Sequence, residues 1–280
     1  MLTVVETISL AGDRREQNDD TCGVGVRAAW VIDGATDLHD EPASGAASDA
    51  AWIAQGLNRF LTSGVRDHSE AALRATLAAA SRALKQAFPL PAGAPGWISP
   101  LCSMLFVAET ADGIAGIDLG DSRCFARDAA SAHEAGGPVG AADRESAFAA
   151  KIAQSSPTQS AALYRAPEAI SVLRELRAKQ NETPEAAVFT LDPRCAEHAR
   201  FWTIPLARPA HILIATDGFS ALVDRYGAYD AGGLVEAALE RGLQELGREL
   251  RAIEADDSGG AKHPRWKRCD DATAILLRLT

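Results

Sequence analysis

The chain has 280 residues, of which 47% are hydrophobic, so it can bury a sizeable core in one large domain or two small ones. Its 28 basic and 38 acidic residues give a formal net charge of −10, which argues against nucleic-acid binding because a phosphate backbone attracts an excess of Lys and Arg. No apolar run is long enough to span a membrane, and residues 1–10 lack the features of a signal peptide. Five scattered cysteines indicate reduced thiols rather than a zinc site, so we expect a cytoplasmic protein.

The N-terminal part of the chain predicts strands on either side of a pair of helices. Strands are expected over residues 2–10, 21–31, 103–108 and 113–119, and helices over residues 43–61 and 69–88. Ser44 is the expected N-cap of the first helix, and residues 21–31 are expected to form a pair of strands with a break near Gly23 and Gly25.

The C-terminal part predicts a long excursion and then a second run of strands. Residues 128–165 are rich in Ala, Gly and Ser and indicate a surface excursion that is partly helical. Strands are expected at residues 124–127, 189–191, 199–205, 212–215 and 272–279, and helices at residues 170–180 and 232–255. Grouped strands and helices favour an α+β layered fold. We expect a single domain over residues 1–280, with a variable excursion near residues 128–185.

Acidic residues stand repeatedly where an apolar, strand-like run meets a loop. The examples are Asp33-Gly34, Asp121, Asp217-Gly218 and Asp270-Asp271. One Asp-Gly pair is usually a turn, because glycine lets the backbone bend sharply. Several such acids from distant parts of the chain indicate a shared cation instead.

A hard divalent cation such as Mg²⁺ or Mn²⁺ prefers carboxylate, carbonyl and water ligands. The chain offers Asp19, Asp20, Asp33, Asp121, Asp217, Asp270 and Asp271. Two metals about 4 Å apart could share a bridging carboxylate and activate a water for in-line attack on phosphorus. An acidic protein can handle phosphate in this way because bound metals reverse the local sign of the charge.

In their order along the chain, these motifs resemble those of the metal-dependent protein phosphatase family of the protein phosphatase 2C type. The matching stretches are Arg15-x-x-Asn18-Asp19-Asp20, Ile32-Asp33-Gly34, Gly120-Asp121-Ser122-Arg123, Ala215-Thr216-Asp217-Gly218 and Asp270-Asp271-Ala272-Thr273. The set spans nearly the whole chain, and Gly-Asp-Ser-Arg is its most specific member. The resemblance implies a bacterial-type serine/threonine phosphatase with a central β-sandwich of two antiparallel sheets, flanked by helices, and a dimetal site at one end.

The resemblance also implies roles at the dimetal site. Asp33 would bridge the two Mn²⁺ or Mg²⁺ ions, and Gly34 would offer its backbone carbonyl. Asp217 and Asp270 would bind one of the metals.

Four further matched residues surround that centre. Asp19 would bind the second metal, directly or through water, with Asp20 nearby. Asp121 matches a position that helps to hold a third, weaker metal in bacterial relatives. Arg15 would hold the substrate phosphate, and its guanidinium suits bidentate phosphate contacts. Asp33 and Arg15 are therefore the expected catalytic residues.

The chain departs from the family pattern directly after Gly34. The family commonly continues with His or Met and then Gly-Gly, whereas this chain reads Ala35-Thr36-Asp37. Relatives with a histidine there can use it as a general acid, and Ala35 cannot. Asp19 replaces the usual Glu, and Asp271 replaces the usual Asn. We therefore expect a dimetal site in a reshaped pocket.

Other residues are open to a structural or a functional interpretation. His39 could act as an acid or an outer ligand, but an exposed loop histidine is the favoured interpretation. Arg123 is expected to pair with a nearby Asp. Arg165, Arg174 and Arg177 are expected either on a solvated helix face or on a flap that selects a phosphopeptide. Ser103 has no His-Asp arrangement, so a serine hydrolase is poorly supported.

The leading hypothesis is a hydrolase: an Mn²⁺- or Mg²⁺-dependent phosphatase that uses a metal-activated water on phosphoserine or phosphothreonine in a phosphoprotein. One alternative keeps the dimetal centre but acts on a small phosphoester. Another is a catalytically weak regulatory or binding module on the same fold. As partners we expect a phosphoprotein substrate, no nucleic acid and no membrane, and we expect a monomer.

Overall fold

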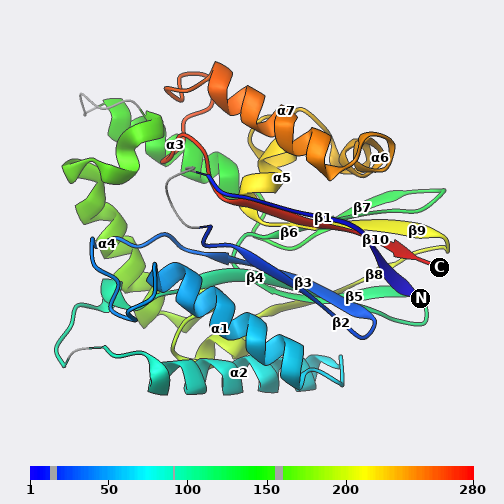
Figure 1. The fold of residues 1–280 in the computed structure, drawn as a ribbon, viewed down its shortest axis with the longest axis horizontal. Coiled ribbons are helices and arrows are strands. Elements are labelled where there is room, and N and C mark those ends of the chain that lie inside the picture. Colours follow the sequence, from blue (N-terminus) through cyan, green and yellow to red (C-terminus); the bar gives the residue numbers. More distant parts are fainter. Residues whose placement is uncertain (13–17, 91, 155–159) are drawn as a thin grey trace.

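In the computed structural model, the strands form two antiparallel sheets of five strands each that pack against one another (Figure 1). The structure describes residues 1–12, 18–90, 92–154 and 160–280. The first sheet contains, in spatial order, β1 (Leu2–Leu10), β10 (Ala272–Leu279), β9 (Ala210–Ala215), β6 (Arg123–Arg127) and β7 (Ala132–Ala135). The second contains β2 (Thr21–Gly25), β3 (Ala28–Gly34), β4 (Cys102–Glu109), β5 (Gly113–Leu119) and β8 (Arg200–Pro205).

The apolar side chains of the central strands alternate between two cores. Val31 and Leu105 of the second sheet join Ile214 of the first sheet in the core between the sheets. Their neighbours Trp30 and Phe106 point the other way and pack in a separate core that includes residues of the covering helices. Strands β3 and β4 are therefore buried on both faces, which explains their continuous apolar sequence.

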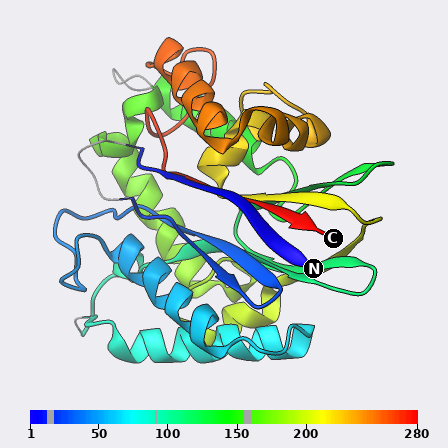
Figure 2. The same ribbon diagram turned by 45° about the vertical axis from the view of Figure 1, so that its right-hand side comes forward.

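Helices cover both outer faces and one end of the sandwich (Figures 1 and 2). Helices α1 (Asp49–Gly64) and α2 (Glu70–Ala87) lie on the second sheet, and α5 (Asp217–Asp224), α6 (Ala231–Arg241) and α7 (Leu243–Asp256) lie on the first. Helices α3 (Ala141–Gln154) and α4 (Pro167–Glu182) lie beyond one end of both sheets, opposite the two chain termini. Short 3₁₀ helices occupy Gly96–Ile98, Ser160–Arg165, Pro184–Ala186 and Pro193–His198. The predicted α-β-β-α layering is confirmed.

Two helix predictions were wrong, and one helix was missed. Helix α1 starts at Asp49 with Ser48 as its N-cap, because the backbone N–H groups of Ala43 and Ser44 instead donate to the Asp49 carboxylate. The predicted helix over residues 232–255 is two helices, separated at Gly242, whose φ of +81° ends a helix readily. The short helix α5 was not predicted.

One strand prediction was wrong, and a second was right only in part. Residues 189–191 form no strand, and Phe189 makes only an isolated bridge with Cys102. The predicted strand pair is present as β2 and β3, and β2 ends at Gly25, but the chain turns near Arg27, whose φ is +59°, and is not broken at Gly23. Gly23 lies within β2, where a Cβ atom would stand 2.5 Å from the indole of Trp30, so its role is close packing. None of the helices in the described part of the chain is both long and apolar enough to cross a bilayer.

Glu109 links the end of β4 to the N-terminus and two loops. Its side chain is 5% exposed and accepts hydrogen bonds from Leu2 N, Arg27 Nε and Arg208 Nη1, each at 3.0 Å. Burial opposes ionisation, but the hydrogen bonds from the two arginines and Leu2 lower the pKa of Glu109 to about 2. Because the pKa is lower in the folded state, this stabilisation is complete above the unfolded pKa and is lost as the pH falls towards 2.

We therefore expect Glu109→Gln to lower the free energy of unfolding by about 1–3 kcal/mol at pH 7. The difference from wild type should shrink as the pH falls from 5 to 3, because the wild-type carboxylate then loses its advantage. Urea denaturation across this pH range measures both effects. Asp112→Asn, in the exposed turn between β4 and β5, is the control, and an equal loss in both variants would contradict the prediction.

Candidate metal centre

Five aspartates from separate segments of the chain lie at the same end of the two sheets. Asp33 is near the end of β3, and Asp121 follows β5. Asp217 begins α5 directly after β9. Asp20 precedes β2 and Asp270 precedes β10. The antiparallel pairing of Asp33 with Ser103, next to the pair Met104 and Leu119, brings the first two acids together.

The carboxyl groups of Asp33 and Asp217 are within hydrogen-bonding distance of one another. Burial, together with the nearby charges of Asp217, Asp20 and Asp121, holds the pKa of Asp33 well above its usual value. The pKa of Asp121 is raised to about 7 by burial and by the charge of Asp217. Like charges this close favour protons or a cation over bare carboxylates.

Asp20 offers an unused ligand atom. One of its oxygens, Oδ2, accepts a hydrogen bond of 2.8 Å from Thr216 Oγ1. Its other oxygen, Oδ1, is buried and has no hydrogen-bond partner among the described residues. An unpaired buried carboxylate oxygen is costly, and a cation would satisfy it. The donor set around Asp20 and Asp33 consists of hard oxygens, so these residues fit Mg²⁺ or Mn²⁺.

Asp270 already has a cation beside it. Lys267 Nζ lies 2.7 Å from Asp270 Oδ1. Burial raises the pKa of Asp270, but the charge and hydrogen bond of Lys267 outweigh burial and lower it. The sequence interpretation did not single out Lys267, although a lysine three residues before a predicted ligand was a visible signal.

Asp19 and Asp271 fasten the chain near the same end. The backbone N–H groups of Gly12 and Asp19 donate to the two carboxylate oxygens of Asp271, each at 2.7 Å. The carboxylate of Asp19 accepts a hydrogen bond from Ser48 Oγ, and burial raises its pKa to about 6. Residues 13–17 come between Gly12 and Asp19 in the sequence. They are outside the described residues, and they include Arg15, the predicted phosphate ligand.

Gly34 permits a close approach of three backbone segments. A Cβ atom at this position would lie 2.6 Å from Ala50 O and 2.8 Å from Asp19 O. Any larger residue would push α1 or the Asp19 segment away from the acids.

The loop after Gly34 is tied to both α1 and α4. The Asp37 carboxylate accepts hydrogen bonds from Asp49 N at 2.8 Å and Ala50 N at 3.0 Å, so it caps α1. The hydroxyl of Tyr164 donates to Asp37 O. Arg177 Nη2 donates to Thr36 O at 3.1 Å.

Arg174 completes this attachment of α4 to the loop. It donates to Leu38 O at 2.7 and 3.0 Å, and its guanidinium lies 4.1 Å from the ring centre of Trp97. Arg177 is only 9% exposed and Arg174 is half-buried, so the alternative of a solvated helix face does not hold for Arg177. Their donors hold backbone carbonyls, and the side chain of Arg165 is outside the described set.

His39 belongs to a structural cluster. The ligand atoms of Asp37, His39 and Asp49 lie within 4.8 Å of one another, and His39 Nε2 is 2.9 Å from Asp49 Oδ2. Both carboxylates already accept backbone N–H groups, so the cluster closes the loop onto α1. The side chain of His39 is 14% exposed, so the prediction of an exposed loop histidine was wrong.

Ser103 orients the Gly-Asp-Ser-Arg turn. Its Oγ accepts hydrogen bonds from Asp121 N and Ser122 N, each at 3.0 Å. Gly120 has a φ of +95°, which favours glycine. Arg123 pairs with Glu134 at 3.0 Å and Asp224 at 3.5 Å, which confirms its predicted ion-pairing role.

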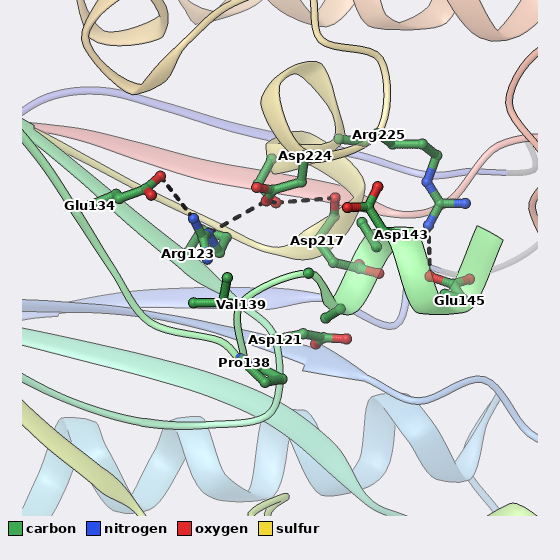
Figure 3. A pocket seen from close by; sticks show the side chains of 15 residues that line it. Asp121, Arg123, Glu134, Pro138, Val139, Asp143, Glu145, Asp217, Asp224 and Arg225 are labelled. Atoms are coloured by element: carbon green, nitrogen blue, oxygen red, sulfur yellow. Dashed lines mark hydrogen bonds and ion pairs between the residues drawn. The ribbon is translucent and has the colours of Figure 1, made fainter. Parts of the chain in front are cut away.

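Two adjoining cavities open onto the acids. The larger, of about 590 Å³, is lined by Asp33, Asp121, Asp217, Asp270 and Lys267 on one side and by Leu38, Leu101, Leu173, Leu176 and Val188 among others on the other. The smaller, of about 190 Å³, shares Asp121 and Asp217 (Figure 3). Glu145 of α3 lines both and pairs with Arg225 at 2.7 Å. No sequence signal marked Glu145, which lies in the excursion.

Comparisons with known proteins identify the family and the fold of this chain. A family model described as Protein phosphatase 2C matches residues 13–251. The serine/threonine phosphatase PstP/Ppp of Mycobacterium tuberculosis has 15% identity and a TM-score of 0.58 over 99% of this chain and 98% of its own. The Ser-Thr phosphatase MsPP of Mycobacterium smegmatis, solved with cacodylate, has 16% identity and a TM-score of 0.54 over 99% and 100%.

A third solved structure, the catalytic domain of PstP in complex with 2 manganese ions, has 15% identity and a TM-score of 0.55 over 99% of this chain and 97% of its own. At these identities the likeness concerns the fold. The search of curated proteins found no match.

The contact between Asp33 and Asp217 predicts that the centre destabilises the metal-free protein. Because the pKa of Asp33 is raised in the folded state, its ionisation costs stability as the pH rises above the usual value of 3.8. In EDTA at pH 8, Asp33→Asn should therefore be more stable than wild type by about 1–3 kcal/mol, or a few degrees in melting temperature. The gain should be smaller at pH 5. Asp112→Asn is the control, and a lower melting temperature for Asp33→Asn would refute the argument.

Proposed function

The chain belongs to the protein phosphatase 2C family of metal-dependent protein phosphatases, and we propose that it hydrolyses phosphoserine and phosphothreonine in proteins with two Mn²⁺ or Mg²⁺ ions. The observation that carries this proposal is the convergence of Asp33, Asp121, Asp217 and Asp270 on one cleft, with the charge of Asp20 close to Asp33. The orphaned Asp20 Oδ1 supports a cation at that place. The manganese complex of PstP supports the choice and number of metals.

The proposed ligands follow from this geometry. Asp33 would bridge the metals with Gly34 O beside it, Asp217 and Asp270 would hold one, and Asp19 or Asp20 would hold the other. Asp121 would serve a third, weaker site. When bound, the metals supply Lewis-acid activation of a water molecule and positive charge for the phosphoryl oxygens.

The protein's own groups keep these ligands in place. Thr216 Oγ1 orients Asp20, and Ser103 Oγ orients the turn that carries Asp121. Asp271 accepts hydrogen bonds from Gly12 N and Asp19 N. The phosphate-binding role that we propose for Arg15 rests on the family motif. Rigid positioning of this kind lowers the reorganisation needed during phosphoryl transfer.

The shape of the cleft supports a protein substrate. Beyond the acids, the cleft of about 590 Å³ continues along apolar side chains of α4, including Leu173 and the 43% exposed Leu176. A small phosphoester would leave this wall unused, whereas the residues that flank a phosphoserine could contact it. We therefore favour a phosphoprotein over a small phosphoester as the substrate. We also favour a phosphatase over a catalytically weak regulatory or binding module.

We propose one phosphatase domain over residues 1–280, in which the excursion near residues 128–185 supplies α3 and α4 at the cleft. We further propose a monomer located in the cytoplasm, where the five free cysteines would stay reduced.

The direct test is hydrolysis of p-nitrophenyl phosphate with added Mn²⁺. Wild type should turn over in a metal-dependent way, and Asp33→Ala should lose at least about 100-fold in kcat, since it removes the bridging carboxylate. Asp112→Ala, which alters an exposed turn outside the cleft, is the matched control. Equal turnover by wild type and Asp33→Ala, or no effect of Mn²⁺, would sink the proposal.

A second test separates protein from small substrates. Leu176→Glu places a charge on the apolar wall without touching the acids, so it should raise KM for phosphopeptides by about tenfold. Its kinetics with p-nitrophenyl phosphate should stay at the wild-type level. Leu239→Glu, a similarly exposed leucine on α6, is the control. A change of equal size with both substrates would argue against peptide binding along α4.

A further inference from the structure

We propose that Lys267 is a resident counter-cation of the acid cluster, which stabilises the metal-free protein and weakens the binding of divalent metal ions at Asp270. The inference rests on the proposed dimetal function, since it concerns one of the proposed ligands. The resemblance to the family assigns no role to this lysine.

The contacts of Lys267 place its charge inside the cleft. Its Nζ lies 2.7 Å from Asp270 Oδ1 and 2.6 Å from Thr36 Oγ1, and 5.7 Å from the ring centre of Tyr164. The side chain is 28% exposed and lines the larger cavity with Asp33 and Asp217. The ammonium group also interacts electrostatically with these two acids.

The charges around it explain why a cation is useful there. Asp20, Asp33, Asp121, Asp217 and Asp270 would carry five negative charges if all were ionised. Arg225 is also near, but its guanidinium is paired with Glu145 at 2.7 Å. Among the described residues, Lys267 is thus the cation that forms an ion pair with one of the five acids. Its charge offsets part of their mutual repulsion.

The positive charge of Lys267 also opposes the binding of a metal ion at Asp270. An ion bound by Asp270 would share that carboxylate with an ammonium group, and two positive charges a few ångströms apart repel one another. Metal binding must therefore proceed against Lys267 or displace it towards the open cleft.

Thr36 connects this lysine to the unusual loop. Its Oγ1 accepts the second hydrogen bond of Lys267, and its carbonyl is held by Arg177. A glycine at this position, which the family pattern commonly has, would offer no hydroxyl. Thr36, in the loop that departs from the family pattern, therefore helps to hold Lys267 beside Asp270.

The test compares Lys267→Met with wild type in two measurements that need no turnover. In EDTA, Lys267→Met should melt at a lower temperature, because the acids lose their counter-charge. In isothermal titration calorimetry of metal-stripped protein with Mn²⁺, it should bind at least about tenfold more tightly. Lys262→Met is the matched control on the same loop, since Lys262 is 67% exposed and pairs only with Asp256. It should change neither measurement.

Two further variants keep the inference testable if Lys267→Met fails to fold without metal. Lys267→Arg keeps the charge and should resemble wild type in both measurements. Thr36→Val removes the hydroxyl tether and should bind Mn²⁺ more tightly, by a smaller factor. Unchanged or weaker Mn²⁺ binding by Lys267→Met would overturn the proposal. If Lys267→Met does not fold, the same result for Thr36→Val would overturn it. If wild type itself binds no Mn²⁺, the dimetal function fails, whereas the melting comparison in EDTA still judges the counter-cation.

Discussion

The mutual repulsion of aspartate carboxylates at one end of the sandwich is the constraint on which the rest of this structure depends. Asp33 and Asp217 are in contact, with Asp20 and Asp121 close by, and each has a raised pKa. Such a cluster persists only where the surrounding structure prevents it from spreading. The two sheets do this, because β3 and β9 are buried strands whose ends cannot move without opening a core.

Hydrogen bonds also hold the acids in place, in addition to the packing of the cores. Thr216, Ser103 and Asp271 each hold a backbone or carboxylate group beside the acids, and none of the three is among the metal ligands that we propose. Asp271 is informative, because the family's asparagine would offer only one acceptor oxygen where this chain has two. Here both oxygens are used, one by Gly12 and one by Asp19.

The loop after Gly34 shows how a departure from a family pattern acquires structural partners. Asp37 caps α1, while Arg174, Arg177 and Tyr164 hold three consecutive carbonyl groups from the side of α4. The loop therefore connects the candidate metal centre to helix α4, which lines the cleft with apolar side chains.

The sequence by itself determined the layered fold, most of the strands and the set of acids, because apolar alternation and short motifs such as Asp33-Gly34 are local patterns. It could not distinguish Ser44 from Ser48 as the cap of α1, since that choice depends on the distant Asp37 and on Asp49. Only the tertiary structure decided that Lys267 meets Asp270 and Thr36, that Glu145 lines the cleft and that Arg177 is buried. These facts depend on contacts between residues as much as 231 positions apart, which no local periodicity encodes.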